Sequence, residues 1–162
     1  MHEQRYVGVV GPGDATPEQR RVARRVGGLL AGRRAVVVTG GLGGVMAAAS
    51  RGAIEAGGTT IGLLPGDERL DGNPYLTVSI PTGMGEMRNA LLVRTSDALI
   101  AVGGSWGTMS EIALSVRTGV PVVSIGGWQM PGPGVLAVAD PEEAVECLHA
   151  LLWRKDPLEG RQ

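Results

Sequence analysis

The stretch ALIAVGGSWGTMSEIALSV, residues 98–116, joins a run of apolar residues to a helix-periodic segment through a loop of glycine, serine and threonine. The run 98–102 is apolar at successive positions, and so is AVVV at 35–38. Runs of this kind are typical of strands that are covered on both faces, as in parallel sheets flanked by helices. The stretch therefore predicts one strand-loop-helix unit of an α/β fold.

Strands and helices alternate along the 162 residues of the chain. Short β-branched runs predict strands at 6–10, 35–39, 60–64, 76–80, 98–102, 120–125 and 135–139. Helical patterns with capping signals predict helices at about 16–30, 44–56, 86–95 and 108–118 and from 140 onwards, and the polar segment 65–74 predicts a loop. Right-handed crossovers place such helices on both faces of a sheet. We expect a single-domain, three-layer, doubly wound Rossmann-like fold with about seven parallel strands, followed by a loose tail from about residue 154.

Composition narrows the class of partner. Lys and Arg number 15 against 16 for Asp and Glu, so the net charge of −1 gives no reason to expect nucleic acid or an anionic membrane. No apolar run approaches the roughly 18 residues of a membrane span. The single cysteine, Cys147, excludes an internal disulfide and suits a reducing compartment. We expect a cytoplasmic protein with a small-molecule ligand.

Scarce residue types exclude several chemistries. Lys155, in the tail, is the only lysine, so a pyridoxal-phosphate Schiff base or a phosphate-loop lysine has no suitable residue. His2 and His149 are the only histidines, and with one cysteine they argue against a His/Cys metal site or a histidine triad. We therefore expect neither a required cofactor nor a metal.

Three glycine-rich loops follow predicted strands and should share one edge of the sheet. Ligands of such folds bind beyond the carboxyl ends of the strands, where helix N-termini favour anions. Glycines there let backbone N–H groups approach phosphate oxygens. The loops predict a site for a phosphorylated small molecule, and their candidate ligand-binding residues are Gly11, Gly13, Gly40, Gly41, Gly43, Gly44, Met46, Gly103, Gly104, Ser105, Gly107 and Thr108.

Two charged residues near these loops have alternative interpretations. Glu111 is spaced from Thr108 as in a capping box, but it also lies one turn beyond a glycine loop. Arg88 gains nothing from the helix dipole in a first turn, which favours acids. It could clamp a phosphate, or it could pair with Glu86 or Asp97. We take Glu111 and Arg88 as the candidate catalytic residues.

The motifs resemble those of a known family. GGSWGTMSE at 103–111 resembles the PGGxGTxxE signature of the LOG-like group, formerly labelled lysine decarboxylases, whose characterised members are cytokinin-activating nucleoside 5′-monophosphate phosphoribohydrolases. TGGLGGVMA at 39–47 resembles its GGGxxGLMG loop, and Arg88, Arg94 and Asp97 keep the family's spacing. The resemblance implies cleavage of a nucleoside monophosphate to free base and ribose 5-phosphate by Glu111 and Arg88. It also implies a homo-oligomer, either a dimer or a tetramer.

Departures from the signature point to a second function. Gly103 replaces the family proline, Ser105 replaces a glycine, and Asn89 stands where the phosphoribohydrolases carry lysine. These variants resemble a sister branch that includes molybdenum cofactor carrier proteins, which bind a phosphorylated pterin as cargo. The alternative function is therefore a carrier that binds molybdopterin without turnover, and a third possibility is a structural oligomer that uses no ligand.

Overall fold

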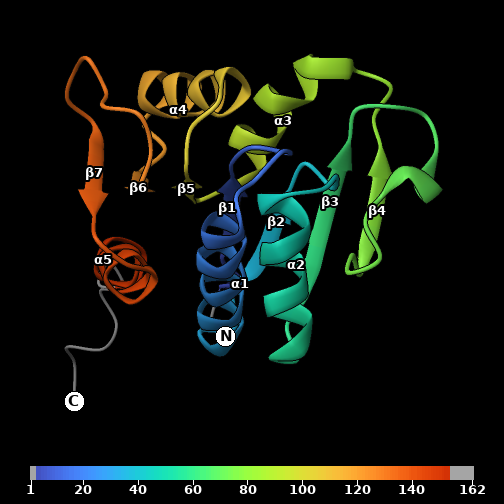
Figure 1. Ribbon diagram of the computed structural model, residues 1–162, viewed down its shortest axis with the longest axis horizontal. Coiled ribbons are helices and arrows are strands. Elements are labelled where there is room, and N and C mark those ends of the chain that lie inside the picture. The colour runs from blue at the N-terminus through green and yellow to red at the C-terminus, as the bar shows by residue number, and fades with distance from the viewer. Residues whose placement is uncertain (1–2, 154–162) are drawn as a thin grey trace.

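The computed structural model describes residues 3–153, so the tail predicted from about residue 154 lies outside the described part. Seven parallel strands form one sheet in the order β4-β3-β2-β1-β5-β6-β7. Figure 1 shows this sheet with its helices. The strands are β1 (Tyr6–Val10), β2 (Val36–Thr39), β3 (Thr60–Leu64), β4 (Val78–Pro81), β5 (Ala98–Val102), β6 (Val122–Ile125) and β7 (Val135–Val138). The sheet confirms the predicted doubly wound α/β fold.

Helices cover both faces of the sheet. One core joins the strands to α1 (Pro17–Gly32), α2 (Val45–Glu55) and α5 (Pro141–Leu152). The opposite core joins them to α3 (Arg88–Thr95) and α4 (Trp106–Thr118). In Figure 1, α1 and α2 lie side by side along β1 to β3. The result is the expected three-layer arrangement.

Local sequence signals account for most helix ends. Thr16 caps α1 with a complete capping box: its side chain accepts from the Gln19 N–H, and Gln19 accepts from the Thr16 N–H. Asp140 caps α5 by accepting from the Glu143 N–H at 2.8 Å. The Glu143 carboxylate accepts from Ala139 instead, so the second box is not reciprocal.

Three predicted boundaries are wrong in detail. The segment predicted as a plain loop, 65–74, contains the short 3-10 helix η1 (Arg69–Asp71). A further 3-10 turn, η2 (Gly85–Met87), precedes α3. Helix α4 begins at Trp106 because Ser105, not Thr108, is its N-cap. Within residues 3–153, no helix combines the length and apolar character needed to cross a membrane.

Glycines set the distance between α1 and α2. A Cβ added at Gly27 would lie 2.0 Å from the Ala49 carbonyl oxygen, and one at Gly52 would lie 1.9 Å from the Arg24 carbonyl oxygen. Both obstacles are backbone atoms and cannot rotate away. The two helices therefore touch backbone to backbone, and α2 depends on this contact for its position over β1 and β2.

Gly27→Ala should destabilise the fold, because the new methyl must push α2 away; overpacking of this kind costs about 1–3 kcal/mol. Gly28→Ala, one position along the same helix, is the matched control. A Cβ there would meet its nearest atom at 3.5 Å, and alanine favours the helix. Urea unfolding of both variants checks this, and equal midpoints for the two would contradict the packing argument.

Candidate functional site

A cavity lies where the chain order in the sheet reverses. From β1 the chain passes to β2 on one side, whereas β5, on the other side of β1, continues to β6. Sheets of this type bind ligands at such a switch point, beyond the carboxyl ends of the strands. The cavity here has a volume of about 170 Å³ and is lined by Val9, Val10, Gly11, Gly13, Gly40, Met46, Arg88, Asn89, Ser105, Gly107, Thr108 and Glu111. We call it the Arg88–Glu111 cavity.

The structure brings most, but not all, of the predicted site residues to this cavity. The wall includes both candidate catalytic residues and the predicted binding residues Gly11, Gly13, Gly40, Met46, Ser105, Gly107 and Thr108. Gly41, Gly43, Gly44, Gly103 and Gly104 belong to the same loops but not to the wall. Gly44 and Gly103 have positive φ values of 62° and 71°, so their part is to shape the loops.

Arg88, the first residue of α3, is buried and points at the loop after β2. Its guanidinium donates to the Gly40 carbonyl at 3.2 Å and to Asn89 Oδ1 at 2.5 Å, whereas its buried Nε has no hydrogen-bond partner among residues 3–153. Gly40 makes this approach possible, because a Cβ there would lie 2.6 Å from Nη2. Burial lowers the pKa of the guanidinium, while the charges of Glu111 and Glu86 oppose that shift. These two hydrogen bonds do not use all of the N–H groups of the guanidinium. Arg88 can therefore donate a hydrogen bond to an anion in the cavity.

The expected partners of Arg88 are not the observed ones. Asp97 accepts from the Tyr6 N–H at 2.8 Å, at the opposite end of α3, and Arg88 forms no ion pair with Glu86 within 4.0 Å. Asn89, which sequence reasoning left out of the site, holds the guanidinium and donates to Ser110 Oγ at 3.2 Å. Its signal in the sequence was its place directly after Arg88.

Glu111 is not a cap. The Thr108 N–H donates to Ser105 Oγ at 3.2 Å, and the two hydroxyls lie 2.9 Å apart, so Ser105 is the N-cap and the capping-box alternative for Thr108 and Glu111 is wrong. Glu111 lies further along α4 and is only 6% exposed. No hydrogen bond from residues 3–153 reaches its carboxylate, and no ion pair within 4.0 Å joins it to Arg88. Its carboxyl group can therefore form a hydrogen bond with a molecule that enters the cavity.

The environment of Glu111 changes its acidity. Burial raises the pKa of its carboxyl group to about 7, and the positive charge of Arg88 opposes this rise. Near neutral pH the group is therefore divided between a protonated form that donates a hydrogen bond and an ionised form that accepts one. The protonation state of Glu111 can therefore change to match that of a bound ligand.

Helix N-termini add positive potential at the same edge. Helix α4 begins at Trp106, and α2 begins after Gly44, which provides no side-chain cap. First-turn N–H groups of helices lack intrahelical acceptors and favour anions. Among residues 3–153, no three His, Cys, Asp or Glu side chains gather into a group suited to a metal ion. The arrangement suits a ligand with an anionic group.

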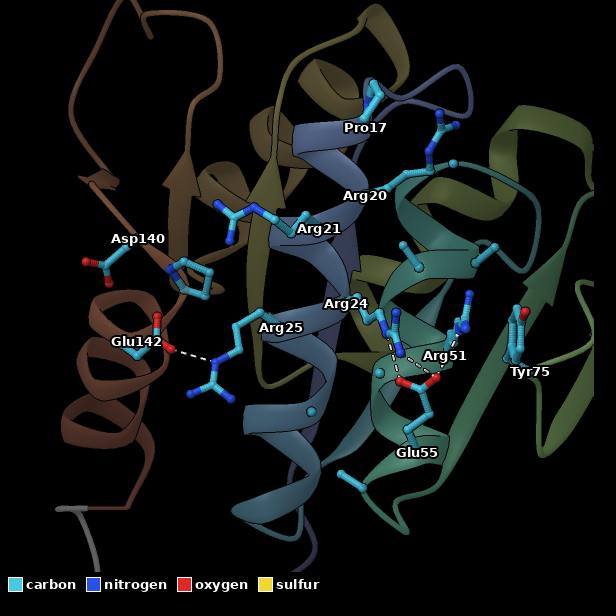
Figure 2. A pocket seen from close by; sticks show the side chains of 17 residues that line it. Pro17, Arg20, Arg21, Arg24, Arg25, Arg51, Glu55, Tyr75, Asp140 and Glu142 are labelled. Carbon is cyan, nitrogen blue, oxygen red and sulfur yellow. Dashed lines mark hydrogen bonds and ion pairs between the residues drawn. The ribbon is translucent and has the colours of Figure 1, made fainter.

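A larger groove, missed by sequence reasoning, lies on the outer face of α1 and α2. It has a volume of about 890 Å³, and no residue of its wall belongs to the Arg88–Glu111 cavity. Figure 2 shows Arg24 and Arg51 converging on Glu55, and Arg25 reaching Glu142 on α5. These pairs are exposed, and exposed pairs contribute only about 0–1 kcal/mol each. The wall holds five arginines, Arg20, Arg21, Arg24, Arg25 and Arg51, against three carboxylates, Glu55, Asp140 and Glu142, so the groove keeps an excess of positive charge.

Replacing Glu111 with glutamine should reduce the loss of folding stability that the protein undergoes as the pH rises from about 5 to about 8. Because folding raises the carboxyl pKa, the wild-type fold loses stability as pH rises from the unfolded value of 4.5 through about 7, by up to about 3 kcal/mol. Glutamine does not ionise. The unfolding free energy of Glu111→Gln minus that of the wild type should therefore increase between about pH 5 and about pH 8.

Glu142→Gln is the control for this measurement. A hydrogen bond from Arg25 lowers the pKa of Glu142, so its carboxylate is ionised throughout the same range in both the folded and the unfolded protein. Its free-energy difference from the wild type should stay constant. A constant difference for Glu111→Gln as well would show that the buried carboxyl group titrates normally.

Comparisons with known proteins agree with this fold. Residues 4–147 match the SLOG cluster4 family. A protein from Archaeoglobus fulgidus is 42% identical over 139 residues, which cover 86% of this chain and 91% of that protein. The solved structure of the molybdenum cofactor binding protein from Rippkaea orientalis has 32% identity and a TM-score of 0.89, over 94% of this chain and 99% of that one. The molybdenum cofactor carrier protein from Chlamydomonas reinhardtii has 33% identity and a TM-score of 0.84, over 93% and 99%. The chain therefore belongs to the SLOG cluster4 family.

Proposed function

We propose that this protein binds the molybdenum cofactor, a phosphorylated pterin, as cargo. The observation that carries the proposal is the match to the Rippkaea orientalis cofactor-binding protein, which extends over 99% of that chain with a TM-score of 0.89. The Arg88–Glu111 cavity supports it from this chain's own residues. Its buried arginine and helix N-terminus are suited to one anionic group of such a ligand.

The size of the cavity limits what it holds. At about 170 Å³ it is smaller than the roughly 300–1,000 Å³ of pockets that enclose a drug-sized ligand. It therefore takes one end of the cargo and leaves the rest at the surface. The Arg88 guanidinium and the first-turn N–H groups of α4 bind the phosphate, and the Glu111 carboxyl group exchanges a hydrogen bond with it. A ligand held at one end on an open surface can be handed on without a large rearrangement.

Hydrolysis of a nucleoside 5′-monophosphate is the second candidate function. It is favoured by Glu111, a buried carboxyl group without a protein partner in the cavity wall. Cleavage of the bond between base and ribose builds positive charge on the sugar, and an ionised Glu111 would stabilise that charge or activate water. The comparisons support the carrier more strongly, because both matched structures named above are cofactor-binding proteins.

Cofactor binding can be measured directly. The purified protein is incubated with the molybdenum cofactor, passed through a desalting column and analysed for molybdenum. We expect retention by the wild type and at least a tenfold loss of affinity in Arg88→Gln, which removes the charged donor. Arg94→Gln makes the same charge change on the exposed side of α3 and should bind normally. Equal retention by both variants would contradict the role of the cavity.

Turnover separates the two functions. The wild type is incubated with each common nucleoside monophosphate and assayed for free base. A carrier releases none. Release of base that falls roughly 10²–10⁴-fold in Glu111→Gln, with the melting temperature preserved, would instead establish the hydrolase and its catalytic carboxylate.

We further propose that the protein is a homo-oligomer, as its resemblance to the LOG-like group implied. Large apolar side chains such as Leu70, Met87 and Leu136 are 95%, 69% and 49% exposed, and association would cover such surface. Light scattering at micromolar concentration should give the mass of a dimer or a tetramer. A monomeric mass would contradict the proposal.

A further inference from the structure

Two exposed tryptophans lie together on a chain that has few aromatic residues. The sequence contains three Trp, two Tyr and no Phe. Trp106 is 81% exposed and Trp128 is 44% exposed, and their ring centroids are 5.0 Å apart at an interplanar angle of 78°. Tryptophan is usually well buried in folded proteins. Packing in the hydrophobic core therefore does not explain this exposed edge-to-face pair.

Both tryptophans lie next to residues of the loop that follows β5, part of which lines the Arg88–Glu111 cavity. Trp106 is the first residue of α4, and its neighbours on either side, Ser105 and Gly107, both line the cavity. Trp128 comes from the connection between β6 and β7 and packs on the glycine loop: a Cβ at Gly104 would lie 2.7 Å from Trp128 Cδ1. Trp128 also lines a second cavity of about 390 Å³, which is bounded by the same connection and by β6 and β7.

We propose that Trp106 and Trp128 form a stacking platform for a planar, fused heteroaromatic ring whose attached phosphate occupies the Arg88–Glu111 cavity. The inference rests on the proposed function in taking that cavity as the phosphate site. A cavity of about 170 Å³ leaves no room for a bicyclic ring beside the phosphate, so the ring lies outside it. Trp106 lies in the chain between Ser105 and Gly107, which line the cavity, and it is 81% exposed.

The contact between the two indoles fits this role. An edge-to-face pair holds both rings in fixed orientations and leaves an indole face uncovered, as the 81% exposure of Trp106 requires. Rings with π-faces stack on such a surface with little dependence on their substituents. Pterins and purines are both fused, nitrogen-rich bicyclic rings. The platform thus recognises the chemical class that the carrier and the hydrolase would share, and the cavity recognises the phosphate.

Fluorescence and calorimetry test the proposal. Trp153 stacks on His149 at a centroid distance of 5.2 Å, at the end of α5, so Trp153→Phe removes the third emitter and leaves only the platform. Four ligands are titrated into this variant: a 6-hydroxymethylpterin phosphate ester, AMP, ribose 5-phosphate and inorganic phosphate. We expect a ring-bearing phosphate to quench the emission and to bind at least tenfold more tightly than ribose 5-phosphate.

Substitutions then assign the effect to the indoles. Trp106→Ala and Trp128→Ala should each weaken the ring-bearing phosphate by roughly tenfold in calorimetry, and ribose 5-phosphate should bind as before. Trp153→Ala is the matched control and should change neither. If the tryptophan variants weaken all four ligands equally, or weaken none, the platform proposal is wrong.

Other outcomes separate the platform from its alternatives. If AMP stacks and the pterin phosphate does not bind, the platform stands and the cofactor proposal fails. If the pterin phosphate binds equally well without either indole, the cofactor proposal stands and the platform fails. If Trp106→Ala instead halves the mass seen in light scattering and leaves ring affinity unchanged, the pair is a contact between subunits and the platform proposal is overturned.

Discussion

Strand β1 is hydrogen-bonded along both edges, to β2 and to β5, and this double pairing fixes the position of the site. Because all three strands run parallel, the segments that follow them leave the sheet at one edge. Gly11, Gly40 and Ser105 thereby reach one cavity although they are far apart in the sequence. The pairing also restricts side-chain size. A Cβ at Gly8 would lie 2.8 Å from Ser96 Oγ and 3.1 Å from Leu92 Cδ2, so the close packing of α3 and its C-cap on β1 depends on glycine at this position.

The buried polar groups of the cavity lower the stability of the fold. Arg88 is buried with an unpartnered Nε, and Glu111 is buried without a hydrogen bond from residues 3–153. Each is the kind of group that a stable interior avoids or pairs. Apolar packing around β1 and β5 supplies the compensation, since Val9, Ile100 and Leu99 have no exposed surface. An incoming phosphate would complete a polar cluster that the protein leaves open.

Local signals in the sequence account for the fold, and tertiary placement accounts for what they missed. Apolar runs located all seven strands, and Thr16 and Asp140 marked their helices correctly. The capping-box interpretation of Thr108 and Glu111, one of the two that the sequence allowed, is wrong because Ser105 is the N-cap and its side chain accepts from the Thr108 N–H. The role of Asn89 and the pairing of Trp106 with Trp128 depend on segments that meet only in space. The periodicity of apolar residues in the sequence does not predict contacts between such distant segments.

The pairing of β1 with β5 also affects the order in which parts of the sheet can form. The hydrogen bond from the Tyr6 N–H to Asp97 closes a separation of 91 residues, whereas β2 pairs with β1, β3 with β2 and β4 with β3 in the order of the chain. The half-sheet β4-β3-β2-β1 is therefore complete in the sequence at Pro81, before β5 begins at Ala98. Until then one edge of β1 has no partner, and an open strand edge is prone to misassociation. Because Glu111 lies on the helix that directly follows β5, the pairing that covers this edge of β1 also brings Glu111 to the loops that follow β1 and β2.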